Sequence, residues 1–414
     1  MTKIFRNDLI YSISAALDYV EHELVNISPH HSKRVALLSA ILGQHLNYPK
    51  EQLLNLAICG ALHDNALSEY QQLKIAEGTK ATPESFVDDL GLHCTIGEEN
   101  ISCLAFYPTV QGAILYHHEN ADGTGPFGKK AAETPIFAQL IHIADTIDAQ
   151  FNLSERTDGK FQQVRDFVHD ETGTLYDPAV AQAFLNCFTD PDNMYLDLAT
   201  LDDRLHQVLP EIEIDYPPKE ILRLADFFAK IIDYKSRFTF NHSSGVAQKA
   251  QQIAVYYGWD TEKQAQFYLS GALHDVGKLM TQTELLEKPG KLTDTEFVQI
   301  KEHAHGTYSV LRPIRGLEHI ARWAYNHHEK LNGSGYPFGI NGAELSKEER
   351  VMNCLDIYQA LRENRPYHEG MSHEKAMAIF HSMADNKEVD EKIVQDIDHC
   401  FKDSPSVPME RVCV

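Results

Sequence analysis

The feature that most constrains the fold is an internal repeat with an offset of 210 to 211 residues. The segment GALHD occurs at residues 60–64 and again at 271–275, so His63 and His274 lie 211 positions apart. Further histidines and aspartates recur at the same or a neighbouring offset: His31 with His242, His93 with His303, His117-His118 with His327-His328, and Asp145 with Asp356. Self-similarity of this length indicates two copies of one structural unit.

Each copy is predicted to be a bundle of helices, so the expected fold class is all-α with two bundles in tandem. The segments 35–46 and 221–232 carry apolar residues at three- and four-residue spacing, while alternating strand patterns are scarce. The paired prolines of DYPPKE at 215–220 interrupt helical patterns on both sides. The predicted domains are therefore residues 1–215 and 216–414.

The charge of the chain limits its partners. The formal charge is 37 − 60 = −23, and so acidic a surface repels DNA, RNA and anionic membranes at long range. No run approaches the ~20 apolar residues of a membrane-spanning helix, and the first residues lack the apolar core of a secretory signal. Seven cysteines without CxxC spacing favour reduced thiols. We therefore expect a cytoplasmic protein.

The residues that recur in both copies are of the types that bind divalent metals. Neutral imidazole nitrogens and carboxylate oxygens suit Fe, Mn, Ni or Zn. The second copy supplies seven such side chains: His242, His274, Asp275, His303, His327, His328 and Asp356. One buried histidine is usually an ordinary core residue, but seven side chains suit two ions about 3.5–4 Å apart that bind a phosphoryl group and produce a hydroxide nucleophile.

Two residues that follow His274, Asp275 and Lys278, add detail to the predicted metal site. If a helix continues through HDVGK at 274–278, His274 and Asp275 point about 100° apart, and Asp275 can bridge both ions. Lys278 then lies one turn after His274 on the same face, within reach of a phosphate oxygen. We predict Asp275 and Lys278 as catalytic residues.

These motifs resemble the HD superfamily of metal-dependent phosphohydrolases and, in the second copy, its HD-GYP subfamily. The second copy carries HDVGK, KPGKLT at 288–293, HHEKLNGSGYP at 327–337 and RPY at 365–367. The tandem arrangement is similar to that of Vibrio HD-GYP proteins that act on cyclic GMP-AMP. The resemblance implies HD-type helical bundles and hydrolysis of a cyclic dinucleotide, 3′,3′-cyclic GMP-AMP or cyclic di-GMP, to a linear dinucleotide by a metal-activated hydroxide.

The resemblance also implies a role for each predicted site residue. One ion would be held by His242, His274, Asp275 and Asp356. The other would be held by Asp275, His303, His327 and His328. Fe or Mn is favoured for these two divalent ions, with Ni, Mg and Zn as alternatives. Lys278 would stabilise charge on the scissile phosphate, and Tyr336 and Arg365 would line the substrate pocket.

Three departures from the family pattern bear on the metals. Members with three ions carry a glutamate four residues before the first histidine, where this chain has Phe238, so we predict two ions. Asn332 replaces the aspartate of HHExxDG, and Gln359 replaces the second aspartate of DxxDA. These changes concern metal affinity and substrate choice rather than the class of reaction.

The first copy keeps the pattern of candidate metal ligands but lacks the residues that correspond to Lys278 and Tyr336. A second candidate metal site comprises His31, His63, Asp64, His93, His117, His118 and Asp145. Leu67 stands where the second copy has Lys278, and GTGPFG at 123–128 has no counterpart of Tyr336. Because loss of one charged contact commonly costs about 10²–10³ in rate, we predict a regulatory first domain that contacts a catalytic second domain.

Two other functions are compatible with the sequence. An HD-type nucleotidase or dNTP hydrolase would use the same metals, and a non-catalytic module would sense a nucleotide through a filled site. The GSGYP and RPY segments favour the phosphodiesterase, and Lys278 argues against a module without chemistry. The preferred cyclic dinucleotide and a homodimeric state stay open.

Overall fold

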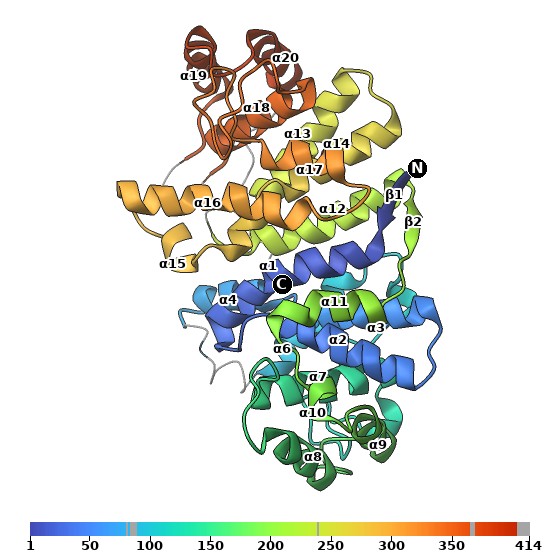
Figure 1. Ribbon diagram of the computed structural model, residues 1–414. Helices are drawn as coiled ribbons and strands as arrows, with labels where there is room; N and C mark the ends of the chain where they lie inside the picture. Colours follow the sequence, from blue (N-terminus) through green and yellow to red (C-terminus); the bar gives the residue numbers. More distant parts are fainter. Residues whose placement is uncertain (80–81, 83–88, 238–239, 365–368, 404–414) are drawn as a thin grey trace. The chain divides into compact units, whose positions relative to one another are not determined.

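The computed structural model describes residues 1–79, 82, 89–237, 240–364 and 369–403. It divides into two compact units, one spanning Phe5–Glu213 and the other combining Met1–Ile4 with the chain from Ile214 onward. Each unit is built of α-helices (Figure 1), and the strands of the described chain form one two-stranded sheet. The all-α prediction is confirmed.

The N-terminal unit contains the first copy of the repeat. Its helices are α1 (Arg6–Val25), α2 (His31–His45), α3 (Lys50–Ala61), α4 (Leu67–Ala76), α6 (Leu90–Ile101), α7 (Ile136–Phe151), α8 (Lys160–Asp170), α9 (Pro178–Cys187), α10 (Pro191–Met194) and α11 (Leu198–Val208). Two 3₁₀ turns, η1 (Tyr107–Thr109) and η2 (Ala131–Glu133), lie in the long connection between α6 and α7.

The C-terminal unit contains the second copy. Its sheet pairs β1 (Thr2–Phe5) with β2 (Glu213–Tyr216). Its helices are α12 (Pro218–Asp233), α13 (His242–Tyr256), α14 (Thr261–Leu273), α15 (Thr283–Leu286), α16 (Asp294–Leu311), α17 (Glu318–Tyr325), α18 (Lys347–Arg362), α19 (His373–Asp385) and α20 (Glu391–Phe401), with a 3₁₀ helix η3 (Val276–Met280). Among the described residues, none of the helices combines the length and the apolar character of a membrane-spanning segment.

The first histidine of each copy begins a helix whose N-terminus is capped by a buried carboxylate. Asp233 accepts hydrogen bonds from the backbone N–H groups of Ser243 (2.7 Å) and Ser244 (3.1 Å) at the start of α13. Asp18 accepts one from the backbone N–H of Ser32 (2.9 Å) at the start of α2. These caps satisfy orphan donors of the first turn and so fix the place where His242 and His31 enter the bundle.

The glycine of GALHD is required by close packing of two helices. A Cβ atom on Gly271 of α14 would lie 2.9 Å from the Ala247 Cα of α13, and one on Gly60 of α3 would lie 3.0 Å from the Ala36 Cα of α2. Because these neighbours are backbone atoms, they cannot move aside as a side chain can. The repeated glycine therefore sets how closely the His-Asp pair approaches the helix that begins with the first histidine.

We predict that Gly60→Ala lowers the free energy of unfolding of the full-length protein by about 1–3 kcal/mol, because the added methyl group displaces α2. The matched control is Gly91→Ala in the same unit, where the nearest atom to an added Cβ is 3.5 Å away. The control should retain or slightly raise stability, since alanine favours helix. Chemical unfolding followed by circular dichroism measures both, and equal midpoints for the two variants would contradict the packing argument.

Candidate metal centres

All seven predicted ligands of the second copy lie together in the C-terminal unit. His242 Nε2 lies 3.1 Å from Asp356 Oδ1 and 3.3 Å from His274 Nε2. On the other side, His303 Nε2 lies 3.2 Å from His328 Nε2 and 3.5 Å from His327 Nε2. The residues come from α13, α16 and α18 and from the segments after α14 and α17. Five segments distant in sequence thus converge on one point.

Asp275 lies between the two histidine groups. Its Oδ2 atom is 3.2 Å from His274 Nε2, and its Oδ1 atom is 3.4 Å from His303 Nε2. Each oxygen of one carboxylate therefore faces a different set of imidazoles. This geometry suits a carboxylate that bridges two cations.

Backbone hydrogen bonds orient the rings of three histidines in this cluster. The Nδ1–H groups of His274, His303 and His327 donate to the carbonyl oxygens three residues earlier, at 2.7, 2.5 and 2.7 Å. A carbonyl only accepts, so the proton sits on Nδ1, and the Nε2 lone pair of each ring points into the cluster. Facing lone pairs repel each other unless a cation lies between them, so the residues present fit metal ions.

The charge states of the buried side chains also suit metal binding. Burial lowers the pKa of His303 to about 4 and that of His327 to about 3, so both rings are neutral near pH 7. Burial opposes the charged form of Asp275, but Lys278 and His274 outweigh it and hold the pKa of this carboxyl well below its usual range. Neutral imidazoles around an ionised carboxylate are the protonation states that metal ligands need.

The local backbone at HDVGK differs from the prediction. The helix α14 ends at Leu273, and Val276–Met280 forms the 3₁₀ helix η3, so the assumed continuous α-helix was wrong. Because residues i and i+3 eclipse each other in a 3₁₀ turn, Lys278 stacks on Asp275, with which its ammonium forms an ion pair. Lys278 therefore lies at the cluster as predicted, through a different local geometry.

The GSGYP loop lies against the cluster. The ring of Tyr336 packs on His328 with centroids 4.6 Å apart, and Lys301 Nζ lies 5.3 Å from the Tyr336 ring centroid. Tyr336 is thus placed beside the candidate site. Arg365 and Phe238, on which the pocket and two-ion predictions partly rest, lie outside the described residues.

A buried glutamate holds this loop in place. The Glu329 carboxylate accepts hydrogen bonds from the backbone N–H groups of Phe338 (2.7 Å), Gly339 (3.1 Å) and Ile340 (2.9 Å). Asn332 accepts from the Ser334 backbone (3.0 Å) and hydroxyl (2.7 Å) in an exposed turn. The third residue of the HHE motif therefore organises the loop, and the Asn332 departure affects a turn rather than a metal ligand.

The first copy brings its seven predicted residues together in the same way. His31 Nε2 lies 3.0 Å from Asp145 Oδ1, and His93 Nε2 lies 3.2 Å from Asp64 Oδ1. His63 Nε2 is 3.7 Å from both Asp64 Oδ2 and Asp145 Oδ1. Further contacts join His117 Nε2 to Asp64 Oδ1 (3.8 Å) and His118 Nδ1 to Asp145 Oδ2 (3.7 Å). The first copy therefore has a second candidate metal centre.

The first centre lacks the lysine of the second, as the sequence indicated. Leu67, at the position of Lys278, is 1% exposed and begins α4 as a core residue. A residue that the sequence reasoning missed, Cys94, places its Sγ 3.5 Å from His93 Nε2. Burial raises the pKa of the Cys94 thiol, and Asp64 raises it further, so the thiol is neutral unless a cation lies beside it.

The carboxylate that holds the first histidine differs between the copies, and sequence reasoning missed both. In the first copy, His31 Nδ1 lies 2.7 Å from Asp148 Oδ2, three residues after Asp145. In the second copy, Gln359 occupies the equivalent position, and His242 Nδ1 instead lies 2.9 Å from Glu363 Oε2. Gln359 donates to the same oxygen at 3.0 Å. Glu363, four residues after Gln359 and directly after the end of α18, thus supplies the carboxylate that Gln359 lacks.

Glu363 also governs the charge of the first histidine. Burial disfavours a proton on His242, but the Glu363 and Asp356 carboxylates outweigh burial and raise the pKa of His242 to about 10. Without an ion, the ring therefore carries a proton between two carboxylates. A bound cation would take the place of that proton at Nε2, so metal binding would release it.

Two buried clusters of imidazoles and carboxylates in helical bundles are typical of metal-dependent proteins. The model of the HD domain family matches residues 18–180 and 226–393, which are the two copies. The 3′3′-cGAMP-specific phosphodiesterase 1 of Vibrio cholerae is 30% identical over 379 residues, which cover 89% of this chain and 85% of that protein. The chain belongs to the HD domain family.

Two further known proteins are similar to this chain in sequence or in fold. A cyclic di-GMP phosphodiesterase of Pseudomonas aeruginosa is 29% identical over 40% of each chain. The crystal structure of a cyclic GMP-AMP-specific phosphodiesterase of Vibrio cholerae superimposes on this chain with a TM-score of 0.65. The match covers 97% of this chain and 99% of that chain, and the two sequences are 22% identical. This last likeness concerns the fold.

We predict that Glu363→Gln weakens binding of one class of Mn²⁺ ions to the full-length protein by about 10–100-fold, because His242 loses the carboxylate that orients it. A metal titration with a competing chelator measures the change. Adding Gln359→Asp to this variant should restore affinity, since it copies the Asp148 arrangement. The matched variant Asp148→Asn should weaken a different class of ions, and unchanged binding in Glu363→Gln would refute the role of Glu363.

Proposed function

We propose that this protein is a metal-dependent phosphodiesterase that hydrolyses a cyclic dinucleotide, 3′,3′-cyclic GMP-AMP or cyclic di-GMP, to a linear dinucleotide at the second copy. The observation that carries the proposal is Asp275, whose two oxygens face separate groups of imidazoles. The relatives named above support the substrate class, since they act on cyclic GMP-AMP or cyclic di-GMP.

The second copy has the ligands for two divalent ions. His242, His274 and Asp356 form one compact group, and His303, His327 and His328 form another. We infer that Asp275 bridges the two groups and that Fe or Mn occupies them. Ions held there would supply positive charge to a phosphoryl group and lower the pKa of a water molecule.

The remaining residues of the site bind and orient the substrate. Lys278 supplies a cation in a chain whose formal charge is −23, and a phosphodiester can replace Asp275 as the partner of its ammonium. The Tyr336 ring offers an aromatic face next to His328 for a base or ribose. Arg365 is proposed as a further substrate contact, by resemblance only.

The first copy is proposed to regulate the second rather than to hydrolyse substrate. It has the imidazoles and carboxylates for metal, but Leu67 cannot pair with a phosphate, and GTGPFG lacks the tyrosine. The domain limits 1–215 and 216–414, a contact between the domains, a homodimer and a cytoplasmic location stay predictions.

We predict that Lys278→Leu, which copies the first centre, lowers kcat by about 10²–10³-fold, because it removes one charged contact to the phosphoryl group. Steady-state hydrolysis by the full-length protein measures this change. Because Lys278 also pairs with Asp275, Mn²⁺ stoichiometry is determined in parallel and should stay constant. An unchanged kcat with full metal content would exclude a catalytic role for Lys278.

We predict that Asp275→Ala abolishes hydrolysis, whereas the matched Asp64→Ala retains it. Cyclic GMP-AMP, cyclic di-GMP and cyclic di-AMP are tested in parallel with Mn²⁺ and Fe²⁺, and the products are separated by chromatography. The reverse pattern of the two variants would assign catalysis to the first copy. Faster turnover of a mononucleotide than of any cyclic dinucleotide would favour an HD-type nucleotidase instead.

A further inference from the structure

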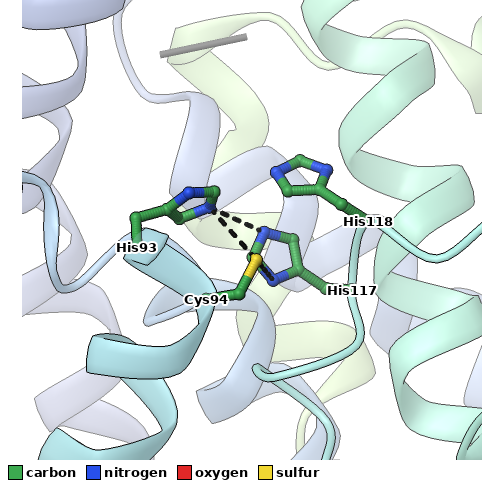
Figure 2. A group of neighbouring side chains, drawn as sticks. All are labelled: His93, Cys94, His117 and His118. Carbon is green, nitrogen blue, oxygen red and sulfur yellow. Dashed lines mark hydrogen bonds between the residues drawn. The ribbon is translucent and has the colours of Figure 1, made fainter. Parts of the chain in front are cut away.

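A cysteine lies within the first candidate metal centre. His93 and Cys94 are consecutive residues of α6, and their side chains meet those of His117 and His118 from the segment before α7 (Figure 2). Cys94 Sγ is 3.5 Å from His93 Nε2 and 3.7 Å from His117 Nδ1. Each of the four residues offers one ligand atom within 4.8 Å of the others.

The second copy has no sulfur at this place. The residue equivalent to Cys94 is Ala304, which is also fully buried. The corresponding group there consists of His303, His327 and His328. The two centres therefore share three histidines and differ by one thiol.

Two histidine nitrogens near the thiol, His117 Nε2 and His118 Nε2, are available to bind a cation. His117 Nδ1 donates to the Ile114 carbonyl at 2.6 Å, which leaves the Nε2 lone pair directed toward His93 Nε2 at 3.5 Å. His118 Nε2 is buried and has no hydrogen-bond partner within the described chain. A buried nitrogen without a partner carries a desolvation cost that a metal bond would remove.

The side chains at paired positions of the two copies also make the first centre more negative than the second. The second centre pairs Asp275 with Lys278, whereas the first has Asp64 and the uncharged Leu67. At these three paired positions, Asp64, Leu67 and a Cys94 thiolate would sum to −2, whereas Asp275, Lys278 and Ala304 sum to 0. Such a site favours retention of a cation and disfavours approach of an anionic phosphodiester.

We propose that Cys94, His93, His117 and His118 bind one thiophilic divalent ion in the first copy, and that Zn²⁺ matches this donor set best. Three imidazoles and one thiolate supply four nitrogen and sulfur donors, the donor types that Zn²⁺ binds in tetrahedral sites, and the Asp64 carboxylate lies beside them. On binding, the S–H bond breaks, the proton passes to solvent, and the sulfur binds the ion without any change of oxidation state. The first centre would then differ from the second in the metal that it selects.

Cobalt(II) reports the presence of sulfur among the ligands of such an ion. Full-length protein is freed of metal and loaded with Co²⁺, and its near-ultraviolet absorption is recorded for thiolate-to-cobalt charge transfer. We expect this band in the unmodified protein and its loss in Cys94→Ala, which copies the natural Ala304, and in Cys94→Ser. Asp275→Ala, which alters the second centre, should keep the band.

Absence of the band from the unmodified protein, or its survival in Cys94→Ala, would overturn the inference. Circular dichroism of each variant shows that it is folded. A second readout is the zinc retained after dialysis against a chelator, which should fall by one ion per chain in Cys94→Ala. Neither readout depends on turnover, so failure of this inference and failure of the proposed hydrolysis are separate results.

Discussion

The two centres depend on the hydrogen bonds made by the Nδ1 atoms of their histidines. In both copies a ring donates to a backbone carbonyl three residues earlier, as for His274 at 2.7 Å and His63 at 2.9 Å. This bond settles which nitrogen carries the proton and directs the other nitrogen inward. The helix ends, the caps and the glycine of GALHD determine where the rings lie. The Nδ1 hydrogen bonds determine that the Nε2 lone pairs point into the cluster.

The partner of the first histidine shows how one constraint is met by two different residues. Asp148 within α7 holds His31, whereas Glu363, the first residue after α18, holds His242. Gly245 leaves room for Gln359, since a Cβ there would lie 2.4 Å from the Gln359 amide nitrogen. The carboxylate has moved while its contact with Nδ1 has been kept, which indicates that the contact matters more than the sequence position.

The copies share a framework and differ in charge. The second has Lys278 and Tyr336 beside its ligands, which suits the binding of a phosphodiester. The first has Leu67 and Cys94, which suits the retention of a cation. The two copies thus contain clusters of similar arrangement whose neighbouring side chains differ in charge.

The family resemblance also explains why the match extends along nearly the whole chain. The HD domain model covers both copies, and each matched range contains one set of the recurring histidines and aspartates. The residues around these imidazoles and carboxylates are where the copies diverge, as at Lys278 and Leu67.

The sequence by itself determined the all-α class from the spacing of its apolar residues. It also determined the two-copy organisation and the recurring histidines and aspartates of both clusters, because the repeat aligns each of them with its counterpart. It could not give the 3₁₀ turn at HDVGK, since the continuous helix assumed there is equally compatible with the residue pattern. Only the tertiary structure revealed Glu363 and Cys94, because neither has a counterpart in the other copy. Their roles depend on contacts between segments that are distant in sequence, as where the end of α18 meets α13 and where α6 meets the segment before α7. The spacing of residues along the chain does not show which segments make such contacts.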